Sequence, residues 1–208
     1  VRCALALEAE ADGFAVACIE EALELRAAGI KAPVLLLEGF FEASELALIA
    51  EHDLWCAVHS LWQLEAIENT PVHKPITVWL KLDSGMHRVG LHAKDYHDAY
   101  QRLLATGKVA RIVLMTHFAR ADELEADATA RQIAVFEAAR EGLAAECSLR
   151  NSPGVLGWPQ AQGDGVGTGL LGYGDSQVAA GHALGTRGKP VEDHRAGTNE
   201  AGRQAEGA

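Results

Sequence analysis

The chain has 208 residues, and its composition, with 49% hydrophobic and 23% charged residues, is typical of a folded globular protein. This composition excludes collagen-like and globally disordered classes, and the length allows one large domain or two small ones. The formal net charge is -11 at pH 7, and the basic residues form no cluster, which argues against nucleic acid as a partner.

No segment is predicted to enter a membrane, because no apolar run approaches the roughly 18 residues of a spanning helix. Val1 begins no signal peptide, so we expect a cytoplasmic protein without a membrane partner. The four cysteines, Cys3, Cys18, Cys56 and Cys147, are too dispersed to indicate a disulfide framework or a metal site. We expect all four to act as small apolar core residues.

Short apolar runs alternate with helical segments along the chain. Strands are predicted over residues 13–17, 34–37, 54–58, 76–82, 111–116 and 146–149. Helices are predicted between them over residues 20–28, 42–52, 61–69, 94–106 and 127–145. Ser60 and Gln63 have the spacing of a capping box at a helix start, and Gly29 and Gly107 stand where left-handed residues would end two helices.

This alternation predicts an α/β fold in which helices cover a parallel sheet. Both a barrel and an open doubly wound sheet fit, and we favour the barrel because no G-x-G-x-x-G motif follows an early strand. A seventh strand is expected near residues 169–173, which gives a partial (β/α)8 TIM barrel over residues 1–174. Residues 175–208 contain few bulky apolar side chains, so we predict a disordered tail there.

Three polar segments stand at predicted strand ends. WLKLDSGMHRVG carries Lys81 and Arg88, MTHFAR carries His117, and LRNSP carries Asn151 and Ser152. Each segment alone has a structural explanation, which is turn formation, a structural histidine, or a lysine whose stem lies along an edge. Together they predict a functional site, because the carboxyl ends of parallel strands meet at one edge of the sheet.

Five segments of the chain resemble consecutive parts of bacterial alanine racemases. They lie at residues 12–26, 34–41, 78–90, 115–122 and 148–159, and LDSGMHRVG and LRNSP are the most specific. That family is a homodimer that joins a pyridoxal 5'-phosphate barrel to a β-rich C-terminal domain. It interconverts L-alanine and D-alanine through a pyridoxal phosphate aldimine by a two-base mechanism and supplies D-alanine for peptidoglycan. The resemblance therefore implies an isomerase, with pyridoxal phosphate as cofactor and alanine as substrate.

The resemblance also implies a role for each residue that matches a family motif. Arg88 matches the arginine that contacts the phenolic oxygen of the cofactor and the substrate carboxylate. Lys81 matches a lysine that is often carbamylated and that orients this arginine. His117 matches the histidine beside the cofactor ring. The remaining matches are expected to bind or support the cofactor, mainly around its phosphate; they are Asn151, Ser152, Gly169 and Tyr173.

The chain also departs from the family pattern. No residue matches the lysine that tethers the cofactor and acts as one base, or the tyrosine that acts as the other. Gly167 occupies the place of the arginine that pairs with the pyridine nitrogen. We therefore expect the chain as written to be inactive. Two alternatives stay open: a pyridoxal-phosphate-binding homeostasis protein on a similar barrel, and a non-functional gene fragment whose tail arises from a frameshift.

Overall fold

The computed structural model describes residues 1–167. Seven strands form one sheet in this part of the chain: β1 (Phe14–Val16), β2 (Val34–Leu36), β3 (Leu54–Val58), β4 (Ile76–Lys81), β5 (Val109–Met115), β6 (Glu146–Asn151) and β7 (Gly165–Gly167). The helices are α1 (Arg2–Leu7), α2 (Ile19–Ala27), α3 (Glu45–Glu51), α4 (Leu61–Asn69), α5 (Ala93–Ala105), α6 (Ala128–Arg140) and α7 (Ser152–Gly157). The predicted strand near residues 169–173 and the predicted tail over residues 175–208 lie outside the described residues.

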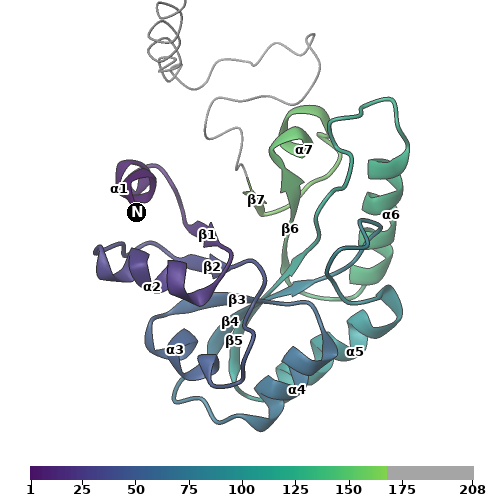
Figure 1. Ribbon diagram of the computed structural model, residues 1–208. Coiled ribbons are helices and arrows are strands. Elements are labelled where there is room, and N and C mark those ends of the chain that lie inside the picture. The colour runs from purple at the N-terminus through teal and green to yellow at the C-terminus, as the bar shows by residue number, and fades with distance from the viewer. Residues whose placement is uncertain (168–208) are drawn as a thin grey trace, which may run out of the picture.

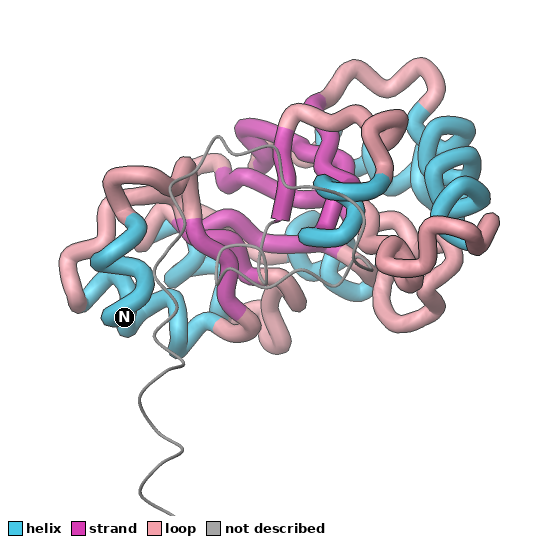
Figure 2. The backbone as a smooth tube through the Cα atoms, turned by 90° about the horizontal axis from the view of Figure 1, so that it is seen from above, coloured by secondary structure: helices cyan, strands magenta, loops and turns pink. Residues whose placement is uncertain are grey.

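The order of the strands decides between the two predicted architectures. Each strand pairs with the next one along the chain, and every pair is parallel. A doubly wound sheet reverses its strand order at a switch point, whereas a barrel adds strands in one direction. The sheet curls, and helices α2 to α6 lie along its outer side (Figure 1). The partial barrel prediction is confirmed, and Figure 2 shows the strands in the middle of the molecule with helices around them.

The main core lies between the outer face of the sheet and the helices. Val78 and Leu80 of β4 are fully buried there against helix residues such as Leu64, Tyr96 and Leu103. The Tyr96 hydroxyl donates a hydrogen bond of 2.8 Å to the carbonyl of Leu80 and fixes α5 to this strand. This apolar face explains why the strands are recognisable as short hydrophobic runs.

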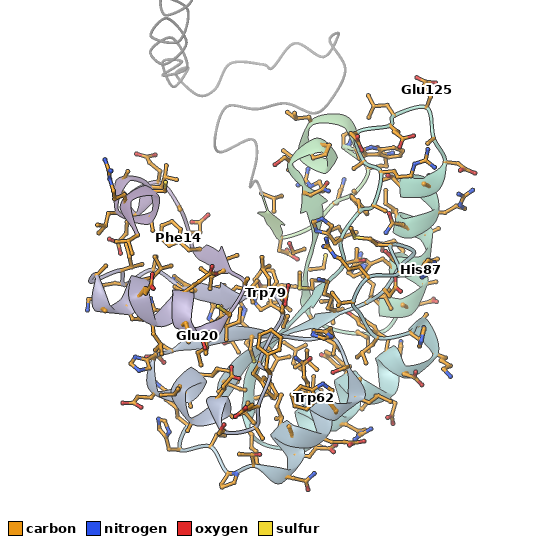
Figure 3. All side chains as sticks on the ribbon, viewed as in Figure 1. Phe14, Glu20, Trp62, Trp79, His87 and Glu125 are labelled. Atoms are coloured by element: carbon orange, nitrogen blue, oxygen red, sulfur yellow. The ribbon has the colours of Figure 1, made fainter. Side chains whose placement is uncertain are left out.

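Alternate residues of each strand point to the inner, concave face of the curved sheet. Trp55 and Trp79 stack there with ring centroids 5.8 Å apart, and the Arg111 guanidinium lies 5.5 Å from the Trp55 ring. Arg111 also forms an ion pair with Glu146 on the neighbouring strand. Trp79 lies at the centre of the molecule in Figure 3, whereas Trp62 lies on the outer helix α4. The concave face is therefore lined by aromatic and charged side chains.

The predicted helix ends are confirmed, whereas the predicted helix start is not. Gly29 and Gly107 have φ values of +93° and +65°, which confirms both as left-handed residues after helices. The predicted capping box is wrong: the Ser60 hydroxyl makes no capping bond to α4. The Gln63 side chain instead accepts from the backbone N–H of His59 at 2.9 Å and donates to the carbonyls of Glu38 and Phe40. Gln63 therefore joins α4 to the loop after β2 rather than closing the helix on itself.

The cysteine prediction holds for two of the four residues. Cys56 and Cys147 are buried, but Cys3 is exposed and Cys18 is half-buried, because both stand near the ends of short helical segments at the surface.

No helix among residues 1–167 is long and apolar enough to cross a membrane.

Candidate active site

The polar residues predicted at three strand ends come together at one edge of the sheet. Lys81 is the last residue of β4, and its register partner on β5 is Met115, which in turn pairs with Ser148 on β6. His117 follows β5 by two residues, and Asn151 ends β6. Because β4, β5 and β6 are parallel neighbours, their carboxyl ends form a continuous rim. The structure thus places Lys81, His117 and Asn151 on adjacent strand ends.

Arg88 lies in a loop that leaves this rim after β4 and returns at Leu91. Leu91 forms a bridge with Leu82, its N–H donates to the Lys81 carbonyl at 2.8 Å, and its carbonyl accepts from the Asp83 N–H at 2.9 Å. The loop is thus closed at its base by backbone hydrogen bonds. It presents Arg88, which is exposed, beside the end of β4.

The Asp83 carboxylate organises the interior of this loop. Its Oδ1 accepts from the backbone N–H groups of Gly85 and His87 at 3.0 and 2.9 Å, and its Oδ2 lies 3.0 Å from His87 Nδ1. These contacts lower the pKa of Asp83 against the opposing effect of its partial burial. His87 has a φ of +56°, and the two contacts from Asp83 to His87 stabilise this left-handed conformation. His87 lies on the side of the molecule where α6 runs (Figure 3).

Lys81 is buried, with only 6% of its surface exposed. Burial lowers the pKa of its amine, the nearby positive charge of Arg88 lowers it further, and Glu38 opposes both effects. Within residues 1–167 the Lys81 amine has no ion pair with a carboxylate. An amine in this position is therefore available as a partner for a negatively charged group.

His117 belongs to the same electrostatic cluster. Its pKa is lowered by burial first, and then by the positive charges of Arg88 and Lys81. These influences place the three predicted catalytic residues within electrostatic range of one another. The cluster favours neutral imidazole at His117 and leaves an excess of positive charge at the rim.

Asn151 and Ser152 lie where β6 turns into α7. The Asn151 carbonyl oxygen accepts from the Gly154 N–H at 3.1 Å, and its amide donates to the Phe118 carbonyl at 3.2 Å. Ser152 is the first residue of α7, with 5% of its surface exposed. Asn151 thus ties the end of β6 to the segment after His117. The predicted residues Gly169 and Tyr173 lie outside the described residues.

Two residues near the rim were missed by sequence analysis. Gln132 of α6 is buried and hydrogen-bonds to the loop of Arg88 and to the segment of His117. Arg150 of β6 has a buried Nε that lacks a hydrogen-bond partner within the described residues. Arg150 stands two residues beyond Ser148 and one before Asn151, so an orphaned cationic donor lies near the predicted site. The only sequence signal for either was a polar residue next to a recognised motif or within a helix.

Comparisons with known proteins show the family of the chain. The model of the alanine racemase N-terminal domain matches residues 1–177. The chain belongs to the alanine racemase family. Members of this family use pyridoxal phosphate, and their activity is an isomerisation. The chain is 83% identical over 191 residues to a catabolic alanine racemase of Pseudomonas putida, a match that covers 92% of this chain and 54% of the relative.

Two further alanine racemases come from one organism, Pseudomonas aeruginosa. Its catabolic alanine racemase is 61% identical over 191 residues, 92% of this chain and 54% of the relative. Its biosynthetic alanine racemase, known from a crystal structure, is 40% identical and superposes with a TM-score of 0.81 over 86% of this chain and 50% of the other. The chain spans about half the length of the relatives it matches. The matches run past residue 174, so the family resemblance reaches further than the sequence motifs indicated.

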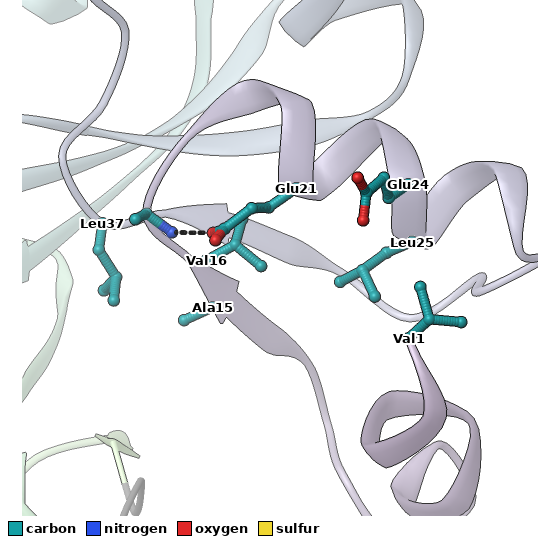
Figure 4. Close-up of a pocket in the computed structure, with 8 residues that line it drawn as sticks. Val1, Ala15, Val16, Glu21, Glu24, Leu25 and Leu37 are labelled. Atoms are coloured by element: carbon teal, nitrogen blue, oxygen red, sulfur yellow. Dashed lines mark hydrogen bonds between the residues drawn. The ribbon is translucent and has the colours of Figure 1, made fainter.

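A separate pocket lies at the β1 border of the sheet, between β1, α1 and α2. Figure 4 shows Val16, Glu21 and Leu37 in its wall, with Glu21 Oε2 accepting from the backbone N–H of Ala17 at 2.8 Å. None of the predicted site residues lines this pocket.

Proposed function

We propose that this chain forms the cofactor-binding barrel of an alanine racemase that interconverts L-alanine and D-alanine. The observation that carries the proposal is the convergence of Lys81, Arg88 and His117 at the carboxyl ends of β4 and β5. All three are nitrogen-bearing side chains, and no carboxylate forms an ion pair with Lys81 or Arg88 within the described residues. Nitrogen donors of this kind suit a ligand that presents hydrogen-bond acceptors and a negative group to Arg88.

Pyridoxal phosphate fits this donor set. The guanidinium of Arg88, together with the orphaned Nε of Arg150, matches a molecule that carries a phosphate and a phenolate. Asn151 and Ser152 are proposed to bind and support the phosphate end, along with Gly169 and Tyr173. When bound, the cofactor acidifies the α-hydrogen of an amino acid by delocalising negative charge. The protein must then bind the substrate, hold the cofactor in position and move protons.

Arg88 is proposed to anchor the substrate carboxylate. A guanidinium is planar and permanently charged, so it can donate two parallel hydrogen bonds to a carboxylate. The loop around Asp83 gives Arg88 a fixed starting position, because the carboxylate of Asp83 is already used by three donors within the loop. His117 is proposed to lie beside the cofactor ring as a neutral imidazole, in agreement with its lowered pKa.

Lys81 is proposed to carry a carbamate. Its lowered pKa favours the neutral amine, whose nitrogen can attack carbon dioxide, form the N–C bond and release a proton. The product bears a negative charge next to Arg88, which would orient the guanidinium and remove the cost of an unpaired buried cation. Intact mass measurement should find the mass of one added carbon dioxide in the native chain and none in Lys81→Met.

The two bases of the reaction are proposed to come from segments that match no residue of this chain, and the complete enzyme is proposed to be a homodimer. We therefore expect no racemisation by the 208-residue chain alone. Gly167 stands in place of a cofactor-binding arginine, and among residues 1–167 a Cβ atom added there would meet only the Arg150 carbonyl, at 3.9 Å. Gly167→Arg should strengthen cofactor binding.

Between the two physiological types, the catabolic one is favoured. The chain is 61% identical to the catabolic enzyme of Pseudomonas aeruginosa and 40% identical to the biosynthetic enzyme of the same organism. Two enzymes in one organism diverge when they serve different roles, so the higher identity favours degradation of alanine over the supply of D-alanine for peptidoglycan. The family assignment gives no support to a cofactor-homeostasis protein.

A chimaera tests the proposal. Residues 1–167 would replace the matching segment of the catabolic alanine racemase of Pseudomonas putida, and D-alanine formation from L-alanine would be measured. We expect racemisation once Gly167→Arg is included, and a loss of at least about a hundredfold when Arg88→Lys is added. A folded, cofactor-loaded chimaera that remains inactive with Gly167→Arg would support the alternative of a non-functional gene fragment.

A further inference from the structure

We propose that Gln132 is a positioning residue that locks the loop of Arg88 to the segment of His117. The contacts of Gln132 are observed directly in this chain. Only the expected effect of Gln132 on racemisation rests on the proposed function. Gln132 lies on α6, is 3% exposed, and reaches the rim from the outer layer of helices.

The side-chain amide of Gln132 contacts both segments at once. Its Nε2 donates to Ser84 Oγ and to the His117 carbonyl, each at 3.0 Å. Its Oε1 accepts from the backbone N–H of Ala119 at 2.9 Å. Both amide protons of the nitrogen are therefore used, one for each segment, and the oxygen holds the far side of His117. A single side chain thus spans the gap between the two predicted catalytic elements.

The bond to Ser84 continues as a chain of hydroxyl groups with a defined direction. Thr116 Oγ1 uses its only proton to donate to the Leu82 carbonyl at 3.0 Å. The contact of 2.7 Å between Ser84 Oγ and Thr116 Oγ1 therefore requires Ser84 as the donor. The Ser84 oxygen can then accept from Gln132. Hydrogen-bond donation therefore runs from Gln132 to Ser84, from Ser84 to Thr116 and from Thr116 to the Leu82 carbonyl. Each donor in such a chain polarises the next, which strengthens the whole.

Packing supports the same assignment. Gly85 has a φ of +138°, and a Cβ atom added there would lie 3.3 Å from Gln132 Cγ. The loop of Arg88 therefore rests directly on the Gln132 stem. Ser84, Thr116 and Gln132 are all buried, so water does not compete for these hydrogen bonds.

An apolar side chain of similar volume would pack at this position without joining the loops. Methionine could fill the space of Gln132 but would leave the Ala119 N–H, the His117 carbonyl and Ser84 without these partners. The amide is thus what links the position of Arg88 to that of His117. A site that binds one substrate between Arg88 and His117 requires that these two residues stay at a fixed separation.

The test uses the 208-residue chain and requires no cofactor. Gln132→Met removes all three hydrogen bonds, and Gln132→Glu keeps only the acceptor for Ala119. Gln101→Met on the exposed face of α5 is the matched control. Nuclear magnetic resonance would follow hydrogen exchange at the Ala119 amide and the titration of the His117 ring, and thermal melting would report stability.

We expect Gln132→Met to speed exchange at Ala119 by about tenfold or more, whereas Gln132→Glu should retain most of the protection. In Gln132→Met the pKa of His117 should rise toward its ordinary value, because the loop of Arg88 is no longer held in a fixed position beside it. The control should change neither quantity. A lower melting temperature with unchanged Ala119 exchange and unchanged His117 titration would overturn the proposal, since Gln132 would then be structural only.

Ser84→Ala provides a second route if Gln132→Met does not fold. It cuts the hydroxyl chain but keeps the bonds from Gln132 to Ala119 and His117, so the pKa of His117 should rise while Ala119 stays protected. In the active chimaera, Gln132→Glu should lower kcat more than it raises KM. An inactive chimaera with altered exchange in the variants would refute the racemase function and leave the positioning role intact.

Discussion

Lys81 is a charged residue in a place where most proteins put an apolar one. Only 6% of it is exposed, and no carboxylate forms an ion pair with it among residues 1–167. A buried cation without a partner costs free energy, which a folded protein tolerates mainly where function requires it. Its motif made Lys81 predictable from sequence. Gln132 was not, because it belongs to no recognised motif and a glutamine within a helix is usually exposed.

In protein prepared without carbon dioxide, where Lys81 carries no carbamate, replacing Lys81 by methionine should therefore stabilise the fold. Lys81→Met keeps the length of the side chain and removes the buried charge, so we expect the free energy of unfolding to rise by about 1 kcal/mol. Urea denaturation at neutral pH would measure it, with Lys94→Met at an exposed position as the control, expected within about 0.5 kcal/mol of the parent. A destabilised Lys81→Met protein would mean that the amine has a stabilising partner.

His117 should make stability depend on pH in a defined window. Its pKa in the folded chain lies below that of the unfolded chain, which is about 6.5, so the unfolded state binds the proton more tightly. The contribution of His117 is complete above about pH 6.5 and is lost as the pH falls through this value toward the lower folded pKa. His117→Gln should reduce the loss of unfolding free energy between about pH 7.5 and 5.5. Parallel curves for both proteins would contradict this.

At the level of elements, most of the fold was predictable because buried parallel strands are short apolar runs. The predicted strand at 54–58 and the predicted helix at 61–69 coincide with β3 and α4. α7 and β7 were missed for physical reasons. α7 contains proline and glycine, which normally indicate a turn, and β7 consists of Gly165, Val166 and Gly167, which carry almost no strand signal. Both elements depend on contacts with β6.

The loop after β4 should depend strongly on Gly90. Its φ is +149°, and a Cβ atom would lie 2.3 Å from the backbone nitrogen of Asp83. Gly90→Ala should therefore open the base of the loop and destabilise the fold by about 3 kcal/mol or more. Gly107→Ala is the matched control, because Gly107 also has positive φ but no atom of the described residues lies within 4 Å of the added Cβ. It should cost only about 1 kcal/mol in the same urea titration.

Lys108 should be a strong cap for α4. Its amine donates to the carbonyls of Ile67, Glu68 and Thr70 at 3.0, 2.7 and 2.8 Å. These include carbonyls of the last turn of α4, which lack partners within the helix. Lys108→Met should lower the free energy of unfolding by about 1 to 2 kcal/mol and speed amide exchange in α4 relative to α6. A uniform change in both helices would point to another cause.

On the scale of the whole molecule, the curved sheet has two unpaired borders within the described residues. β1 pairs only with β2, and β7 pairs only with β6. Leu37 and Phe41 are also exposed large apolar residues in the loop after β2. Unpaired strand edges and exposed apolar groups favour association with other chains. The sequence indicated these unpaired edges only because it predicted fewer than the eight strands of a closed barrel.

The 208-residue chain should therefore self-associate in a concentration-dependent manner. Sedimentation velocity would detect this, and the double variant Leu37→Lys with Phe41→Lys should shift the distribution toward monomer. Leu104→Lys is the control, because Leu104 is 51% exposed but lies on the outer helix α5. A monodisperse parent chain would show that the borders and the apolar loop are covered in another way.

The sequential order of the strands has a further consequence for how the protein is made. Every strand pairs only with its immediate neighbours in the chain, and Val34 pairs with Leu54 while Leu36 pairs with Cys56. No pairing within residues 1–167 waits for a distant segment, so the loops to be closed are short. A nascent chain leaving the ribosome could add one strand and one helix at a time to a sheet already formed. Synthesis and folding of this barrel can therefore proceed in the same direction.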